Sequence, residues 1–95
     1  MARRGDFFNV LETTDYSQIA AMTIEPGGTS GSDGLHSGDQ VVVILEGEAE
    51  VRIEDKTVKA SVHEVVIIPA KKKHVIVNNS KKDIFLLSVY APPAY

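Results

Sequence analysis

The sequence predicts an all-β protein, built from short antiparallel strands that pack as a sandwich or a barrel. Short runs rich in Val and Ile recur along the chain, and each is ended by Gly, Pro, Asp, Asn or Ser. No segment shows the apolar period of 3.6 residues that is typical of an amphipathic helix. Turn signals at this spacing favour sheets over helices.

About eight or nine strands are expected, in an order that can be read along the chain. They lie near residues 7–12 and then at 18–25, 40–45, 49–53, 57–60, 65–68, 74–77 and 84–90. Residues 49–53 alternate apolar side chains with the charged Glu50 and Arg52, which is typical of a strand with one buried face. Glu54-Asp55-Lys56 is interpreted as the hairpin turn that follows it.

Two of the expected strands are apolar on both faces. Residues 41–45 and 84–87 carry apolar side chains at successive positions, so both sides of each strand avoid water. The outer face of so small a barrel should be polar unless something covers it. A second copy of the chain is the predicted cover, which makes the protein a homodimer; the alternative is a strand or terminus of the same chain.

Length and composition restrict the class of protein. The 95 residues suffice for one domain over 1–95, with 43% hydrophobic and 24% charged residues as in ordinary globular proteins. Lys and Arg number 10 against 13 Asp and Glu, and this net charge of −3 argues against nucleic acid as a partner. There is no cysteine, and no apolar run is long enough for a membrane span or a secretory signal. A soluble cytoplasmic protein without a membrane partner is expected.

Three histidines are the first candidates for a functional site: His36, His63 and His74. In an extended chain Gln40 would lie roughly 13 Å from His36, too far to share a ligand. The intervening Ser37-Gly38-Asp39 is a turn signal, however, and a turn there would bring Gln40 beside His36.

The spacing of glycine, histidine, proline and asparagine residues resembles the motifs of a known protein family. The first pattern comprises Gly28, His36, Gln40 and Gly47, and the second comprises His63, Pro69, Lys71, His74 and Asn78. Their spacings are similar to the two motifs of the cupin superfamily, G-x5-H-x-H-x3/4-E-x6-G and G-x5-P-x-G-x2-H-x3-N. The resemblance covers over half of the chain. It implies a small antiparallel cupin-type β-barrel, also called a double-stranded β-helix or jelly roll.

The same resemblance implies a divalent metal site. Metal-binding cupins hold one ion with two histidines and a glutamate of the first motif and the histidine of the second. Here the matching ligands are His36, Gln40 and His74, whereas Gly34 stands at the first histidine position and the adjacent Asp33 could substitute for it. Ni, Zn, Fe and Mn all accept such nitrogen and oxygen ligands. The glycine positions of the second motif are His63 and Lys71, and His63 is interpreted as a turn residue.

Four other residues are candidates for the pocket or its rim: Met22, Lys71, Phe85 and Tyr90. Lys71-Lys72-Lys73 precedes His74 and would form a basic rim that attracts an anionic small molecule; the alternative is a solvated loop. Met22, Phe85 and Tyr90 would line a pocket or pack in the core.

Three functions follow, because the fold does not fix the activity. In the first, a divalent ion at His36, Gln40 and His74 serves an isomerase, lyase or dioxygenase that acts on a small anionic organic molecule. In the second, the barrel is a metal-free module that binds a small ligand without catalysis. In the third, the apolar sheet face is an interaction surface.

Overall fold

The computed structural model describes residues 8–31 and 36–95, and in this part of the chain every regular element is a β-strand. The first four strands are β1 (Phe8–Thr13), β2 (Gln18–Ile24), β3 (Asp39–Glu46) and β4 (Ala49–Ile53). The other four are β5 (Lys56–Ala60), β6 (Val65–Ile68), β7 (His74–Val77) and β8 (Ile84–Ala91). The all-β prediction is confirmed. Within the described ranges no helix has the length and apolar character that a membrane crossing requires.

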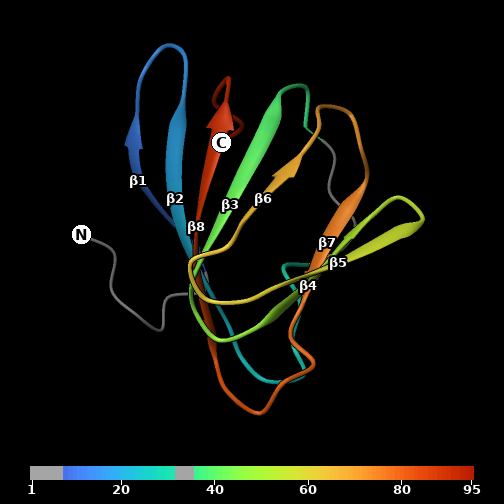
Figure 1. Cartoon of the computed structure of the whole chain (residues 1–95). Coiled ribbons are helices and arrows are strands. Elements are labelled where there is room, and N and C mark those ends of the chain that lie inside the picture. The colour runs from blue at the N-terminus through green and yellow to red at the C-terminus, as the bar shows by residue number, and fades with distance from the viewer. Residues whose placement is uncertain (1–7, 32–35) are drawn as a thin grey trace.

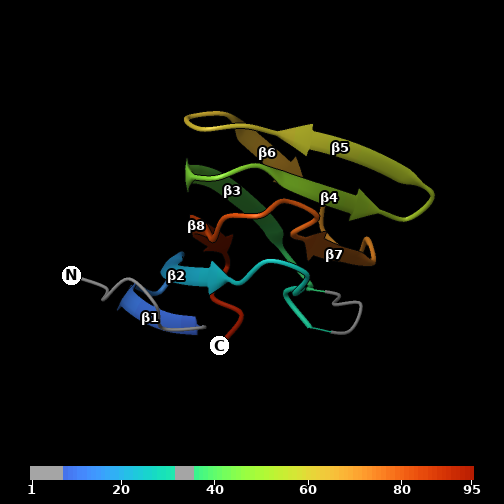
Figure 2. The same ribbon diagram turned by 90° about the horizontal axis from the view of Figure 1, so that it is seen from below.

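The strands form two antiparallel sheets that face each other. The larger sheet has the order β1-β2-β8-β3-β6, and the smaller has the order β5-β4-β7. Figure 1 shows the strands of the larger sheet side by side, and Figure 2 shows the smaller sheet across from it. Strands distant in sequence are neighbours, as in a jelly roll: β8 lies between β2 and β3.

The hydrophobic core fills the space between the two sheets. Alternate residues of β3 and β8, such as Val42, Ile44 and Leu86, point inward and are fully buried. The core consists of Met22, Ile24, Val42, Ile44, Ala49, Val51, Ala60, Val66, Ile68, Ile76, Ile84 and Leu86. Both sheets contribute to this set, so the core closes only when the sheets meet.

Strand boundaries differ from the expectations where backbone pairing extends a strand past its apolar run. Lys56 was expected in the turn but pairs with Ile53, which leaves a two-residue hairpin turn with Glu54 at φ 53°. Asp39 was likewise expected in a turn but begins β3 opposite Ala91. The first strand starts at Phe8, and residue 7 lies outside the described part.

The residues at the two glycine positions of the second motif adopt left-handed backbone conformations. His63 has φ 69° and Lys71 has φ 64°, whereas most residues with a Cβ avoid this region. The turn at His63 is therefore confirmed. Both positions show why glycine suits them: the chain reverses there before β6 and before β7.

Candidate functional site

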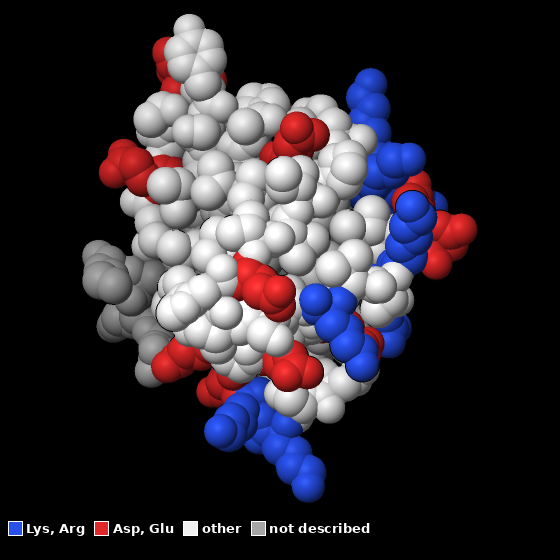
Figure 3. Space-filling model, in the orientation of Figure 1, with Lys and Arg blue, Asp and Glu red and all other residues white. Residues whose placement is uncertain are grey.

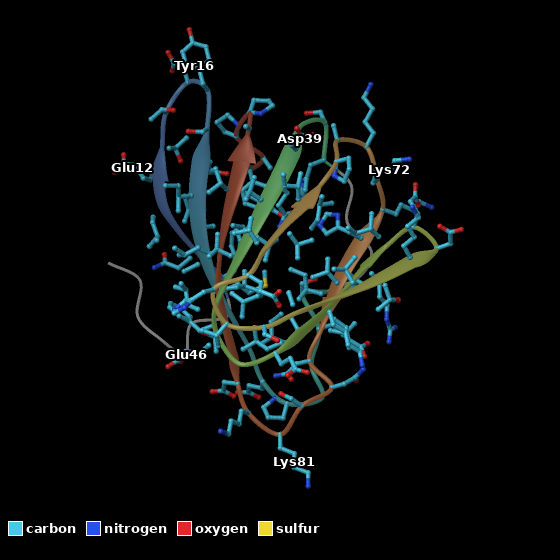
Figure 4. The ribbon with its side chains drawn as sticks, in the orientation of Figure 1. Glu12, Tyr16, Asp39, Glu46, Lys72 and Lys81 are labelled. Carbon is cyan, nitrogen blue, oxygen red and sulfur yellow. The ribbon has the colours of Figure 1, made fainter. Side chains whose placement is uncertain are left out.

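A small cavity opens between the sheets at the end of the barrel where β3 and β7 begin. It has a volume of about 60 Å³ and is lined by Met22, Ser30, His36, Gln40, His74, Ile76, Tyr90 and Tyr95. Figure 4 shows Asp39, at the start of β3, and Lys72, just before β7, at this same end. A water molecule needs roughly 10–15 Å³ of such volume, so the cavity has room for only a few water-sized groups.

The structure brings the three predicted ligands together. Gln40 lies on β3 in the larger sheet and His74 on β7 in the smaller sheet, and His36 lies just before the bend at residues 37–38. The ring centroids of His36 and His74 are 5.4 Å apart. Gly34 and Asp33, the other two residues of the predicted site, lie outside the described residues.

Gln40 carries an oxygen with no hydrogen-bond partner. Its side chain is buried, and Nε2 donates to the Ser88 hydroxyl at 3.1 Å. Among the buried side-chain nitrogens and oxygens of the described residues, Gln40 Oε1 stands out as unpartnered. A buried amide oxygen without a partner costs free energy, so this atom has a free acceptor position beside the cavity.

Each of the two imidazoles has one feature that suits it to bind a metal ion. His74 Nδ1 lies 3.3 Å from the carbonyl of Lys72, which can only accept a hydrogen bond, so Nδ1 is the donor and Nε2 is the ring nitrogen left for a ligand. Partial burial, and after it the neighbouring His74, lowers the pKa of His36 below its ordinary value. The lowered pKa favours the neutral form of His36, which is the form of imidazole that binds metal ions.

The chemistry of this donor set fits a divalent ion. Two imidazoles that share an ion at about 2.0–2.1 Å have ring centroids about 5 Å apart, which agrees with the separation of His36 and His74. Gln40 Oε1 would be the third ligand. No three His, Cys, Asp or Glu residues come together in the described part of the chain, so a site here depends on this neutral amide.

The aromatic wall of the cavity includes a residue that the sequence analysis missed. The Tyr90 ring packs edge-on against His36 at 5.2 Å between centroids, and the Tyr95 ring packs against both at 5.2 and 5.5 Å. Burial, and then the neighbouring Tyr95, raises the pKa of Tyr90, so its hydroxyl stays protonated. Buried Gln18 holds the Tyr95 backbone through both amide atoms, at 2.7 and 2.9 Å.

Ile76 was missed as a lining residue as well, and so was Ser30, which is hydrogen-bonded to it. Its backbone N–H donates to the Ile76 carbonyl and its hydroxyl accepts from the Ile76 N–H, at 2.8 and 2.9 Å. These bonds fix the Gly-rich segment against β7. Nothing in its local pattern marks Ser30, because the register of this segment is set by a contact 46 residues away.

The pocket and rim candidates divide between two locations. Met22 and Tyr90 line the cavity, whereas Phe85, an odd number of positions from Tyr90 on β8, faces the other side of the sheet. The Lys71 side chain is exposed and does not line the cavity, although its N–H donates to the His36 carbonyl at 2.7 Å. Arg52, Glu54 and Lys73 line a separate depression beside His74.

These features define a class: a jelly roll of two antiparallel sheets with a histidine-lined cavity at one end. A family model described as "Cupin domain" matches residues 20–90. The chain belongs to the cupin superfamily, and the fold that the resemblance implied is confirmed.

Several solved structures are similar to this chain. The protein BH2720 from Bacillus halodurans is 27% identical, with a TM-score of 0.91 over 98% of this chain and 75% of that one. TT1209 from Thermus thermophilus is 26% identical, with a TM-score of 0.82 over 90% of this chain and 81% of that one. A cupin superfamily protein from Desulfitobacterium hafniense is 26% identical, with a TM-score of 0.81 over 98% and 84%. No curated protein matches.

Proposed function

We propose that this cupin binds a divalent metal ion through His36, Gln40 and His74 and uses it to hold a small anionic organic molecule. Gln40 Oε1 carries this proposal, because a buried oxygen without a partner is explained if a cation is that partner. A bound ion would act as a Lewis acid toward an oxygen atom of the ligand. This role would serve an isomerase or a lyase, whereas in a dioxygenase the ion would bind dioxygen.

The chain's own residues would position both the ion and the ligand. Ser88 fixes the Gln40 amide with Nε2 away from the cavity, and the Lys72 carbonyl fixes the orientation of the His74 ring. Met22 and Ile76 supply the apolar part of the cavity lining. The volume of about 60 Å³ admits only the reacting end of an organic molecule.

Positive charge near the mouth supports an anionic ligand. Two cationic residues, Arg52 and Lys73, line the depression beside His74, against one acidic residue, Glu54. Figure 3 shows Lys and Arg side chains along the right-hand side of the molecule, the side of the smaller sheet in Figure 1, with Asp and Glu side chains among them. Such a cluster attracts anions from solution, although the chain as a whole carries a net charge of −3.

The test is metal binding by the purified protein without a histidine tag. Calorimetric titration with Ni²⁺, Zn²⁺, Mn²⁺ and anaerobic Fe²⁺ should give one ion per chain. His74→Ala should abolish binding, because it removes one of three ligands. Gln40→Glu should tighten binding at least about tenfold, which needs only about 1.4 kcal/mol of added attraction from a carboxylate.

The matched control is His63→Asn, which removes the third imidazole and tolerates the left-handed backbone at that turn. It should leave metal affinity unchanged. If the wild-type protein binds none of the four ions at saturating concentration, the metal-free binding module is favoured instead. If His74→Ala binds as well as wild type, the ligands have been assigned to the wrong residues.

A further inference from the structure

After β8 the chain leaves the larger sheet and returns to the cavity. β8 ends at Ala91, which pairs with Asp39, and the next two residues are prolines, which have no backbone N–H to continue the ladder. Residues 92–95, here called the strap, run from β8 toward β1 and β2 (Figure 2). Tyr95 is one of the residues that line the cavity. The strap is therefore a part of the cavity wall that belongs to neither sheet.

One side chain, Gln18, makes the hydrogen bonds that hold the strap backbone in the described part of the chain. Its Oε1 accepts from the N–H groups of Ala94 and Tyr95 at 3.2 and 2.9 Å, and its Nε2 donates to the Tyr95 carbonyl at 2.7 Å. Nε2 also donates to the Thr13 hydroxyl at 3.0 Å, which ties Gln18 to the neighbouring strand. The strap can therefore detach from Gln18 without breaking the pairing of any strand.

The Tyr95 ring is covered on one side only. It packs against Phe8, Tyr90 and His36 at 4.9, 5.2 and 5.5 Å between centroids, yet Tyr95 is 64% exposed. Tyr90, which it contacts, is 2% exposed. No residue of the strap belongs to the hydrophobic core. The ring can therefore leave its place while the core stays closed, as segments with few buried contacts do.

We propose that the strap is a lid whose opening controls what enters the cavity. With the strap in place the cavity has a volume of about 60 Å³, which admits a metal ion and a few water-sized groups. An organic ligand has to displace the Tyr95 ring before it reaches His36 and His74. The proposal concerns the cavity alone and holds with or without a bound metal ion.

Two features favour closure of the strap again after it opens. Pro92 and Pro93 each have a fixed φ, so the open strap has few conformations and loses little entropy when it closes. Opening also removes three of the four hydrogen bonds of the buried Gln18 amide. Buried polar atoms without partners cost free energy, so the closed state is favoured until a ligand takes the place of the strap.

Hydrogen exchange on the metal-free protein tests whether the strap opens by itself. The Ala94 and Tyr95 amide protons bond to the same oxygen, so they should exchange together, with protection factors at least about a hundredfold below that of the buried Leu86 amide on β8. Low concentrations of urea should leave exchange in the strap unchanged and accelerate exchange at Leu86, because only unfolding of the barrel exposes much surface. If all three amides share one protection factor and one urea dependence, the strap opens only with the barrel and the proposal is wrong.

Chemical modification of the metal-free protein tests whether the strap controls access. Diethyl pyrocarbonate acylates neutral imidazoles and is too large for the closed cavity, and mass spectrometry of peptides follows each histidine separately. His74, which is 8% exposed, should react much more slowly than the exposed His63. Tyr95→Ala and Gln18→Leu should each raise the rate at His74 at least about tenfold and leave the rate at His63 unchanged. Tyr95→Phe keeps the ring and is the matched control, so its rate at His74 should stay within about twofold of wild type.

Two results of this modification would overturn the proposal. If wild-type His74 reacts as fast as His63, the cavity is open without any movement of the strap. If both Tyr95→Ala and Gln18→Leu leave the rate at His74 unchanged, the reagent reaches it by another route, such as the depression beside it. Circular dichroism of each variant shows whether the β-sheets are intact. If Tyr95→Ala does not fold, Gln18→Leu and the exchange measurement on the wild type still decide.

Discussion

Asn78 is the last residue of the second motif, and we expect truncation of its side chain to be strongly destabilising. Its side chain is fully buried, and Nδ2 donates to the carbonyls of Ile24 and Lys82 at 2.9 and 2.8 Å. Oδ1 accepts from the N–H and the hydroxyl of Ser80 at 2.9 and 2.7 Å. The amide thereby joins the end of β2 to the loop that leads into β8.

The loss can be worked from these four hydrogen bonds. Each contributes a net of about 1 kcal/mol, and the Ile24 carbonyl would be left buried without this partner, so Asn78→Ala should lower the free energy of unfolding by about 4 kcal/mol. A 95-residue domain has only about 5–14 kcal/mol in total. With a urea m-value of about 1.5 kcal/mol per molar, the midpoint should fall by about 2.7 M.

The neighbouring Asn79→Ala is the matched control in the same urea titration. Asn79 is exposed and donates one hydrogen bond, at 2.9 Å, to Glu50 Oε2, so its removal should cost under about 1 kcal/mol. Asn78→Asp should be at least as damaging as Asn78→Ala, because it sets an oxygen against two carbonyls. The reasoning is refuted if Asn78→Ala and Asn79→Ala shift the midpoint equally.

Three further outcomes are expected. Gly38→Ala should lower the melting temperature, because the new Cβ would overlap the Ala91 carbonyl and Pro92 Cδ. It should also weaken any metal binding, because the overlap would move the bend between His36 and Gln40. A melting temperature equal to that of the wild type would contradict this reasoning. Gln18→Leu should accelerate exchange of the Tyr95 amide hydrogen at least about tenfold, because it removes the oxygen that accepts from that N–H. If NMR shows unchanged exchange, Gln18 does not hold the Tyr95 backbone. Tyr95→Ala should shift the ring-proton resonances of His36 by removing a ring 5.5 Å away, whereas Tyr16→Ala, at an exposed turn, should not.

Much of the fold could be predicted from the sequence because alternation and turn residues are local signals. The apolar runs located all eight strands, and the errors at Asp39 and Lys56 arose where pairing with a distant or adjacent strand extended a strand into polar residues. Local sequence does not report such pairing.

The candidate site depended more on motif spacing and less on periodicity. His36, Gln40 and His74 follow from the resemblance, whereas Met22 and Tyr90 were two of three residues expected either in a pocket or in the core. Phe85 could have been separated from Tyr90 by strand parity alone. Tyr95 could not have been found, because its place depends on the amide of Gln18, 77 residues earlier in the chain.

The position of the cavity between the two sheets links ligand binding to the stability of the folded chain. His74 belongs to the smaller sheet, and Gln40 and Tyr90 to the larger, so any molecule that contacts all three ties the sheets together. Such a ligand binds only the closed barrel, and at a hundred times its Kd it adds about 2.7 kcal/mol to the free energy of unfolding. Substitutions that weaken binding of such a ligand would therefore also lower the stability of the folded chain in a cell. Selection on what the cavity binds and selection on how firmly the barrel stays closed act on the same residues.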